Sequence, residues 1–318
     1  MVRPGARGAV LVATAHPDDE TLAMGGTLAW LAHYGWQVTI VCATRGERGW
    51  IADPLLSTRD ALGLVREQEL RRAAQVLGAG DVCLLDFCDG TLSAIDRADL
   101  AGAFAAAIRR IRPQLVFTWG PDGGYGHPDH VAVCRAVTAA FQATARGQDD
   151  RRALYYFSVR PPAIMRGLRW LSHRLRRRPA ASPPFRTPEW TTAIDVSAYR
   201  KARLEALRQH RTQIPADVWL RGVAALLAPR NHFAFSSVER FHRAYPPLRP
   251  GEPHEIGFWQ QPRSGVERVP LAATRAIVGA GAPAIWAGPG AAPAGYGRSR
   301  ISLRRQRMRS DTSSLSST

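Results

Sequence analysis

The stretch AVLVATAHPDDE, residues 9–20, decides the fold of this chain. Its first half is a run of small apolar residues, which is typical of a strand buried on both faces of a parallel sheet. The run ends in a histidine and two adjacent aspartates, His16, Asp18 and Asp19. Open α/β sheets bind their ligands outside the carboxyl ends of such strands, so these side chains stand where a site is expected.

A second polar cluster, GHPDH at 126–130, follows another apolar run, QLVFTW at 114–119. Taken singly, each cluster has a plain structural explanation. An acidic run before a helix is favoured by the helix dipole, and a strand-end histidine often caps or packs. Taken together, two strand-end clusters of His and Asp favour convergence on one divalent metal. A zinc hydrolase uses three such ligands and leaves a position open for water and substrate.

The rest of the chain alternates strand and helix patterns. We expect strands over 9–15, 37–44, 82–87, 114–119, 154–159 and 191–196, and helices over 20–34, 59–77, 96–111, 128–145 and 197–211. This alternation predicts an α/β fold: a doubly wound, mostly parallel, Rossmann-like sheet with helices on both faces.

Two segments interrupt this rhythm. Residues 160–190 are rich in proline and arginine, and we expect them to form an insertion or lid over the rim of the site. Their basic and apolar residues favour a solvated helix, and weak contact with an anionic membrane surface through 160–178 is the alternative. Residues 262–318 are Ala/Gly/Pro-rich and then Arg/Ser-rich, which predicts a disordered basic tail. The catalytic domain is therefore expected over 1–261.

The net charge of +17 is unevenly spread. Nearly all of it comes from 151–178 and 261–318, so the remaining chain is close to neutral. Lys201 is the only lysine, which indicates a coding bias towards arginine rather than a nucleic-acid surface. We therefore expect no specific nucleic-acid partner, and the sequence leaves the oligomeric state open.

The start of the chain has no secretory h-region, and no run approaches the ~20 apolar residues that span a bilayer. The four cysteines lie in or beside expected core elements and lack the spacing of a zinc knuckle. Small buried thiols of this kind are typical of a reducing compartment, so a cytoplasmic location is expected.

The motifs AHPDDE at 15–20, GGYG at 123–126 and HPDH at 127–130 resemble those of the LmbE-like, or PIG-L, family of zinc-dependent de-N-acetylases. The resemblance covers roughly residues 8–215. It implies a Zn²⁺ site, although Fe²⁺ also suits a His₂Asp set with open positions. Carried over position by position, the metal ligands are His16, Asp19 and His130.

The same resemblance implies the catalytic roles. Asp18 is the expected general base, which takes a proton from the attacking water. His127 is expected to stabilise the oxyanion as a cation or to protonate the leaving amine. Asp129 is its expected orienting partner, and the Tyr125 hydroxyl is expected to assist at the oxyanion. The glycines around Tyr125 suggest a loop that moves.

Three further residues are candidates for substrate binding. Arg66 matches a family position where an arginine contacts sugar hydroxyls, and a helix ion pair with Glu69 is the alternative. Asp89, in a Cys-Asp-Gly stretch after the third strand, could accept hydrogen bonds from a sugar or simply form a turn. Arg45 follows the second strand and either shapes the site or belongs to a plain surface loop.

The sequence therefore predicts a metal-dependent amide hydrolase. It would remove an acetyl group from a small N-acetylated amino sugar or its conjugate, by direct attack of metal-bound water. One alternative is an amidase that cleaves a larger N-acyl or thiol conjugate at the same site. Another is a non-catalytic binder of anionic surfaces, against which the intact set of His and Asp residues argues.

Overall fold

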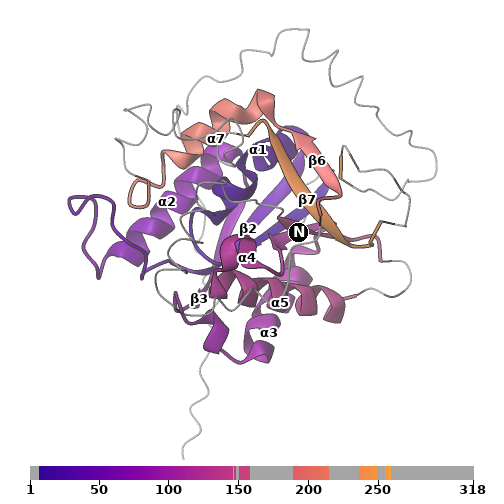
Figure 1. Cartoon of the computed structure of the whole chain (residues 1–318), viewed down its shortest axis with the longest axis horizontal. Coiled ribbons are helices and arrows are strands. Elements are labelled where there is room, and N and C mark those ends of the chain that lie inside the picture. Colours follow the sequence, from indigo (N-terminus) through magenta and orange to yellow (C-terminus); the bar gives the residue numbers. More distant parts are fainter. Residues whose placement is uncertain are drawn as a thin grey trace, which may run out of the picture. The chain divides into compact units, whose positions relative to one another are not determined.

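The computed structural model describes residues 7–145, 147, 150–157, 189–214 and 236–248, with four single residues between 252 and 258. Its core is a seven-stranded sheet in the order β3-β2-β1-β4-β5-β7-β6 (Figure 1). The strands are β1 (Gly8–Thr14), β2 (Trp36–Thr44), β3 (Asp81–Phe87), β4 (Leu115–Trp119), β5 (Ala153–Phe157), β6 (Thr192–Asp195) and β7 (Val238–Tyr245).

Strands β1 to β5 pair in parallel, and β1 lies at their centre. Every residue of β1 is buried, as its apolar run requires. The chain builds outward from β1 through β2 to β3 and then crosses to β4, on the other side of β1. The direction of winding thus reverses between β1 and β4, and ligands of open α/β sheets bind at such a switch point. Both polar motifs follow these two strands.

Helices cover both faces of the sheet (Figure 1). On one face α1, α2 and α7 contact one another, and α3 and α5 pack together on the other. Their bounds are α1 (Asp19–His33), α2 (Leu62–Leu77), α3 (Arg97–Ile111), α5 (Pro128–Ala143) and α7 (Arg200–Leu207), and a short helix, α4 (Gly123–Gly126), precedes α5. The doubly wound, mostly parallel, Rossmann-like α/β fold predicted from the sequence is confirmed.

The last strand of the sheet was not predicted. β7 runs antiparallel to both β5 and β6. Its buried positions include Glu239 and Arg243 beside Phe241, so charged residues occupy places where a buried strand normally shows apolar ones. The alternation of hydrophobicity that marks a strand is hidden for this reason.

Helix α1 is broken at Met24, whose backbone leaves the helical region. A buried ion pair between Arg203 and Glu239, 3.0 Å apart, lies at the break. Arg203 donates to two carbonyl groups before the break, and Glu239 accepts from two amides after it. The carbonyls are those of Thr21 (3.3 Å) and Leu22 (2.6 Å), and the amides those of Gly26 (3.0 Å) and Thr27 (2.7 Å). The break therefore leaves these four backbone groups bonded, as buried polar groups require.

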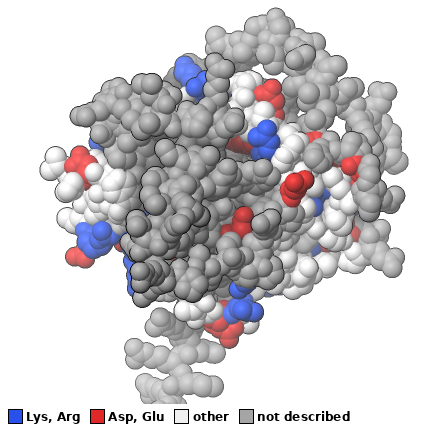
Figure 2. All heavy atoms as spheres, viewed as in Figure 1, with Lys and Arg blue, Asp and Glu red and all other residues white. Residues whose placement is uncertain are grey.

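The insertion expected over 160–190 falls almost wholly outside the described residues, as do the membrane contact expected through 160–178 and the tail over 262–318. Among the described helices, none is long and apolar enough to cross a membrane. All four cysteines are free, and Cys88 is exposed rather than part of the core. Figure 2 shows basic and acidic side chains of the described residues intermingled on one face.

Candidate active site

The turn after β1 folds around the carboxylate of Asp19. Its Oδ2 atom accepts hydrogen bonds from the backbone amides of Ala15 (3.0 Å) and His16 (2.9 Å). The same oxygen accepts a bond from Trp119 Nε1 at 3.1 Å, which joins the end of β1 to the end of β4. Asp18 then takes a positive φ of 111°, which is rare for a residue with a side chain. The turn thereby directs two adjacent aspartates to different partners.

The structure brings together the three predicted metal ligands. His130 Nε2 lies 3.3 Å from Asp19 Oδ1 and 3.3 Å from His16 Nδ1. His16 Nδ1 lies 3.8 Å from Asp19 Oδ2. All three side chains are buried. Two imidazole nitrogens and the Asp19 carboxylate therefore lie within 3.8 Å of one another, at the switch between β1 and β4.

The outer nitrogen of each histidine is already bonded. His130 Nδ1 lies 3.1 Å from the Gly123 carbonyl oxygen, to which it can only donate. His16 Nε2 lies 3.0 Å from Asp89 Oδ1 and 3.3 Å from Asp129 Oδ2. These partners place protons on the outer nitrogens, so that His130 Nε2 and His16 Nδ1, which face each other, are the nitrogens available to a metal. Bonded outer nitrogens of this kind orient and strengthen metal-binding histidines, so the residues present fit a divalent metal.

The charge of the centre supports this fit. Burial alone would lower the pKa of His16, but its hydrogen bonds to Asp129 and Asp89 outweigh that effect and raise the pKa to about 10. Burial would raise the pKa of Asp19, but the charge of His130, its hydrogen bond and the charge of His16 hold it well below the usual range. Without a metal, a proton on His16 thus supplies positive charge beside the Asp19 carboxylate. A metal ion competes with that proton for the same nitrogen.

Among the described residues, two further groups have ligand atoms within 4.8 Å of one another. One joins His127 to His16 and His130, and the other joins Asp89 and Asp129 to His16. In the second group the carboxylates already accept from His16 Nε2, so a hydrogen-bonded support for His16 explains it. The first group makes His127 an alternative to Asp19 as a ligand, which a metal-content measurement can decide.

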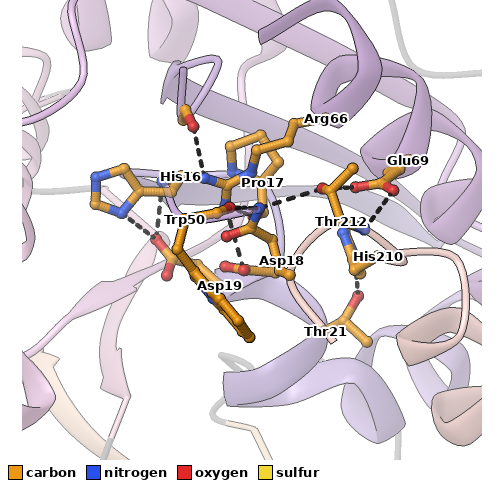
Figure 3. A network of polar contacts seen from close by, with 12 residues as sticks. His16, Pro17, Asp18, Asp19, Thr21, Trp50, Arg66, Glu69, His210 and Thr212 are labelled. Atoms are coloured by element: carbon orange, nitrogen blue, oxygen red, sulfur yellow. Dashed lines mark hydrogen bonds and ion pairs between the residues drawn. The ribbon is translucent and has the colours of Figure 1, made fainter. Parts of the chain in front are cut away.

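Asp18 lies at the rim of this centre, and its ion-pair partner among the described residues is Arg66, at 3.2 Å from Oδ2 (Figure 3). Arg66 also donates to the carbonyl oxygens of Pro17 and Gly46, so its guanidinium braces the turn. Burial raises the pKa of Asp18 to about 6, against the opposing charge of Arg66. A carboxylate with such a pKa can accept a proton near neutral pH better than an ordinary aspartate.

His127 caps the start of α5. Its Nδ1 atom accepts a hydrogen bond from the backbone amide of Asp129 at 3.2 Å, which leaves Nε2 to carry the proton. Burial and the charges of His130 and His16 lower the pKa of His127. The sequence predicted a cationic His127 oriented by the Asp129 carboxylate. In the structure His127 Nδ1 contacts the Asp129 amide, and the Asp129 carboxylate contacts His16 Nε2.

Tyr125 lies near the centre, with its ring 5.2 Å from that of His130 and 5.9 Å from that of His127. Its side chain is 50% exposed, in contrast to the buried ligands. It therefore stands at the solvent side of the site, where the sequence predicted a residue that assists at the oxyanion.

The three predicted substrate-binding residues lie in different surroundings. Arg66 is buried and its guanidinium holds the turn at Pro17 and Asp18. Asp89 is buried against His16 and also accepts from the Arg48 amide. Arg45 forms ion pairs with Glu67 and Asp86. Arg66 and Asp89 thus contact other residues of the site, Asp18 and His16. The ion-pair partners of Arg45, Glu67 and Asp86, are not among the predicted site residues.

Sequence reasoning missed Trp119. Its indole stacks on the His130 imidazole, with ring centres 4.0 Å apart and planes inclined by 9°. Because it also bonds Asp19, one side chain holds two of the three ligands in place. The available signal was its position: Trp119 is the last residue of β4, at the strand end where sites form.

The fold and the centre define a class of protein: a doubly wound α/β protein with a His–carboxylate ligand set at its switch point, suited to metal-dependent hydrolysis. Residues 11–141 match the family model described as "PIG-L: GlcNAc-PI de-N-acetylase". A Saccharomonospora viridis protein named 1D-myo-inositol 2-acetamido-2-deoxy-alpha-D-glucopyranoside deacetylase is 37% identical in an alignment of 231 residues that covers 64% of this chain and 85% of the relative. The chain belongs to the PIG-L family.

Solved structures share the fold. N,N'-diacetylchitobiose deacetylase from Pyrococcus horikoshii superposes with a TM-score of 0.53 at 21% identity, over 74% of this chain and 83% of that one. GalB, the 4-carboxy-2-hydroxymuconate hydratase from Pseudomonas putida, gives a TM-score of 0.51 at 20% identity, over 76% and 98%. The second likeness shows that this fold also carries hydration chemistry, so the reaction must be argued from the site.

Proposed function

We propose that this protein is a metal-dependent N-deacetylase whose substrate is N-acetylglucosamine joined to a polyol such as myo-inositol. The observation that carries the proposal is the proximity of His16 Nδ1, His130 Nε2 and the Asp19 carboxylate, with both histidines bonded on their outer nitrogens. Family membership supports the acetyl-removing reaction. The name of the Saccharomonospora relative supports the sugar and its inositol partner.

His16, Asp19 and His130 would hold the metal, and we propose Zn²⁺, with Fe²⁺ as the alternative that the same ligand set accepts. When bound, such an ion polarises the amide carbonyl and acidifies water. Asp89 and Asp129 keep His16 turned towards the centre through its Nε2 atom. Trp119 does the same for Asp19 and His130.

Asp18 is the proposed general base. It lies between His16 and Asp19 in sequence and at the rim of the centre, and its pKa is raised to about 6 by burial. The ionised form accepts the proton of the attacking water and can pass it to the departing amine. Arg66 holds the carboxylate through Oδ2, so the proton is expected to go to the other oxygen.

His127 would stabilise the negative charge that develops on the carbonyl oxygen. Its Nδ1 atom is engaged by the Asp129 amide, so the proton on Nε2 is the one available for donation. A neutral donor that is held in place before the reaction is as suitable for this role as a cation. Tyr125, at the solvent side, is the proposed second donor.

Two alternatives remain separate from this proposal. An amidase for a larger N-acyl or thiol conjugate would use the same residues and differ in the substrate alone. A non-catalytic binder of anionic surfaces would depend on residues 160–178, which lie outside the described structure. The buried, prearranged ligand set favours the enzymes over the binder.

The test is release of free amine from a panel of N-acylated compounds by metal-loaded protein. The panel holds 1D-myo-inositol 2-acetamido-2-deoxy-α-D-glucopyranoside, N,N'-diacetylchitobiose, free N-acetylglucosamine and a glucosamine conjugate whose nitrogen carries an S-conjugated cysteinyl group in place of acetyl. We expect the inositol conjugate to have the highest kcat/KM. Preference for the cysteine conjugate would favour the amidase, and no release from any member, with metal bound, would contradict the proposed function.

A further inference from the structure

The segment that follows α7, HRTQ at 210–213, contacts the end of the turn after β1 through His210. His210 is fully buried, with Nε2 3.1 Å from Glu20 Oε1 and 3.4 Å from Thr21 Oγ1 (Figure 3). Two residues further on, Thr212 donates to both oxygens of Glu69, at 2.8 and 2.6 Å. A part of the chain almost 200 positions away thus reaches the motif that follows β1.

Glu20 connects His210 with Asp18. One carboxylate oxygen, Oε1, faces His210, and the other, Oε2, accepts the backbone amide of Asp18 at 3.2 Å. Glu20 has no solvent exposure, so water cannot replace either bond. The orientation of this carboxylate therefore depends on the groups around it: the Thr21 hydroxyl, which also donates to Oε1, and His210, which lies farthest from the turn in sequence.

Asp18 needs such support because its φ of 111° is unfavourable for a residue with a Cβ atom. Conformations of this kind persist where the surrounding structure over-determines them. Arg66 holds the Asp18 carboxylate and the preceding Pro17 carbonyl, and Glu20 holds the Asp18 amide. The side chain and the backbone amide of Asp18 are thus held by two different residues.

The other nitrogen of the His210 ring does not contribute. Nδ1 is buried and has no hydrogen-bond partner among the described residues. The hydrogen-bonding role of this buried imidazole therefore belongs to its other nitrogen, Nε2. That role is the contact with Glu20 and Thr21.

We propose that His210 is a positioning residue for the reaction: through Glu20 it keeps Asp18 in the conformation from which that carboxylate acts as general base. The inference rests on the proposed function for the role of Asp18. The arrangement of His210, Glu20 and Asp18 is independent of it and can be tested separately.

The experiment compares two amide replacements. The side-chain nitrogen of His210→Gln can reach the place of Nε2, whereas that of His210→Asn reaches only the place of Nδ1. Misplacement of a catalytic group by about 1 Å costs roughly 10²-fold. We expect His210→Asn to lose about 10- to 100-fold in kcat with KM and bound metal unchanged, and His210→Gln to recover most of the loss.

A matched control removes ordinary stabilisation from the same segment. Thr212→Val deletes the hydroxyl bond to Glu69 and leaves the His210 contact intact. We expect Thr212→Val to lower the melting temperature as His210→Asn does, with kcat close to that of the parent. An equal loss of kcat in Thr212→Val and His210→Asn would overturn the positioning role and indicate plain destabilisation.

A readout without substrate separates this inference from the proposed function. In metal-free protein, the Asp18 amide should exchange its hydrogen faster in His210→Asn than in the parent, and at the parent rate in His210→Gln. If the parent protein deacetylates nothing but this pattern holds, the proposed function fails and the arrangement stands. If Asp18 exchange is unaffected in folded His210→Asn protein, the inference is overturned whatever the activity.

Discussion

The two turns at the switch point serve one centre but are built differently. The turn after β1, residues 15–20, is buried except for the half-buried Asp18, and bonds from β4, α2 and the segment after α7 hold it. The turn after β4, residues 123–130, buries its ligand His130 but leaves His127 half-buried and Tyr125 exposed. The side chains of the first turn are held in the interior, whereas the second turn exposes His127 and Tyr125 to a substrate that enters from solvent.

Their backbones show the same contrast. The first turn contains a positive φ at an aspartate, Asp18, and bonds from its surroundings offset that cost. The second has positive φ at Gly123, Gly124 and Gly126, where no Cβ opposes it. The first turn thus depends on specific partners, and the second on the absence of side chains. Apart from the proposed ligand His130, substitutions in the second turn should therefore have smaller effects than substitutions in the first.

The largest effect should follow removal of a ligand. His16→Ala, Asp19→Ala and His130→Ala each leave two ligands, so bound metal should fall well below one per chain and turnover should vanish. Elemental analysis and amine release measure the two. In the parent, metal binding at neutral pH should also release a proton, because the pKa of His16 is raised to about 10 in its absence. Full metal content in Asp19→Ala, with loss in His127→Ala, would replace Asp19 by His127 in the ligand set.

The next effect concerns the base. Asp18→Asn keeps the shape of the turn and removes the proton acceptor, so kcat should fall by about 10²- to 10⁴-fold with metal retained. The ionised carboxylate of Asp18 is the active form, and burial raises its pKa to about 6. The kcat/KM of the parent should therefore fall as the pH falls through about 6. Where the charge of a bound metal ion lowers this pKa, the fall should come at a lower pH. A metal-loaded Asp18→Asn protein with parental kcat would exclude the role.

In the second turn, His127→Ala should lower kcat by roughly 10²- to 10³-fold, the usual weight of one oxyanion donor, and leave metal content unchanged. Because the proton on Nε2 of the neutral ring is the one used, His127→Gln should recover part of the loss. Steady-state kinetics of both variants, at equal metal occupancy, provide the check. Complete inactivity of His127→Gln would favour a cationic His127 instead.

The smallest effect is expected from a glycine substitution in the second turn, where contact of the added Cβ atom can be distinguished from backbone strain. A Cβ atom on Gly124 would lie 2.7 Å from the Trp119 ring, whereas one on Gly35 would meet nothing within 4 Å, and both residues have φ near 75–80°. Gly124→Ala should therefore weaken metal binding by about 10- to 100-fold through Trp119, the weight of groups that orient ligands. Gly35→Ala should cost stability alone. Metal titrations and melting curves distinguish the two, and equal metal affinities would show that Trp119 does not support the centre.

The fold and the place of the site could be predicted because each depended on a local pattern. Apolar runs ending in His and Asp indicated both the strands and the place of the site. The partners of those residues could not be predicted in the same way. His210 and Trp119 act through contacts that only the folded chain creates, and Asp129 turned out to face His16 because the Gly90 and Leu92 amides bind its carboxylate. The strand β7 was hidden by its buried charges, Glu239 and Arg243.

The break in α1 has a consequence for how the protein is made. The backbone amides of Gly26 and Thr27 donate to the Glu239 carboxylate, which lies 213 and 212 positions later in the chain and is synthesised after them. At about 5–20 residues per second, a ribosome needs on the order of 10–40 s to add that stretch. During that time the helix that begins at the metal-binding turn is without its buried cap. We therefore expect α1 to reach its final packing only after β7 is synthesised, and a nascent chain that stops before β7 to leave these two amides without that partner.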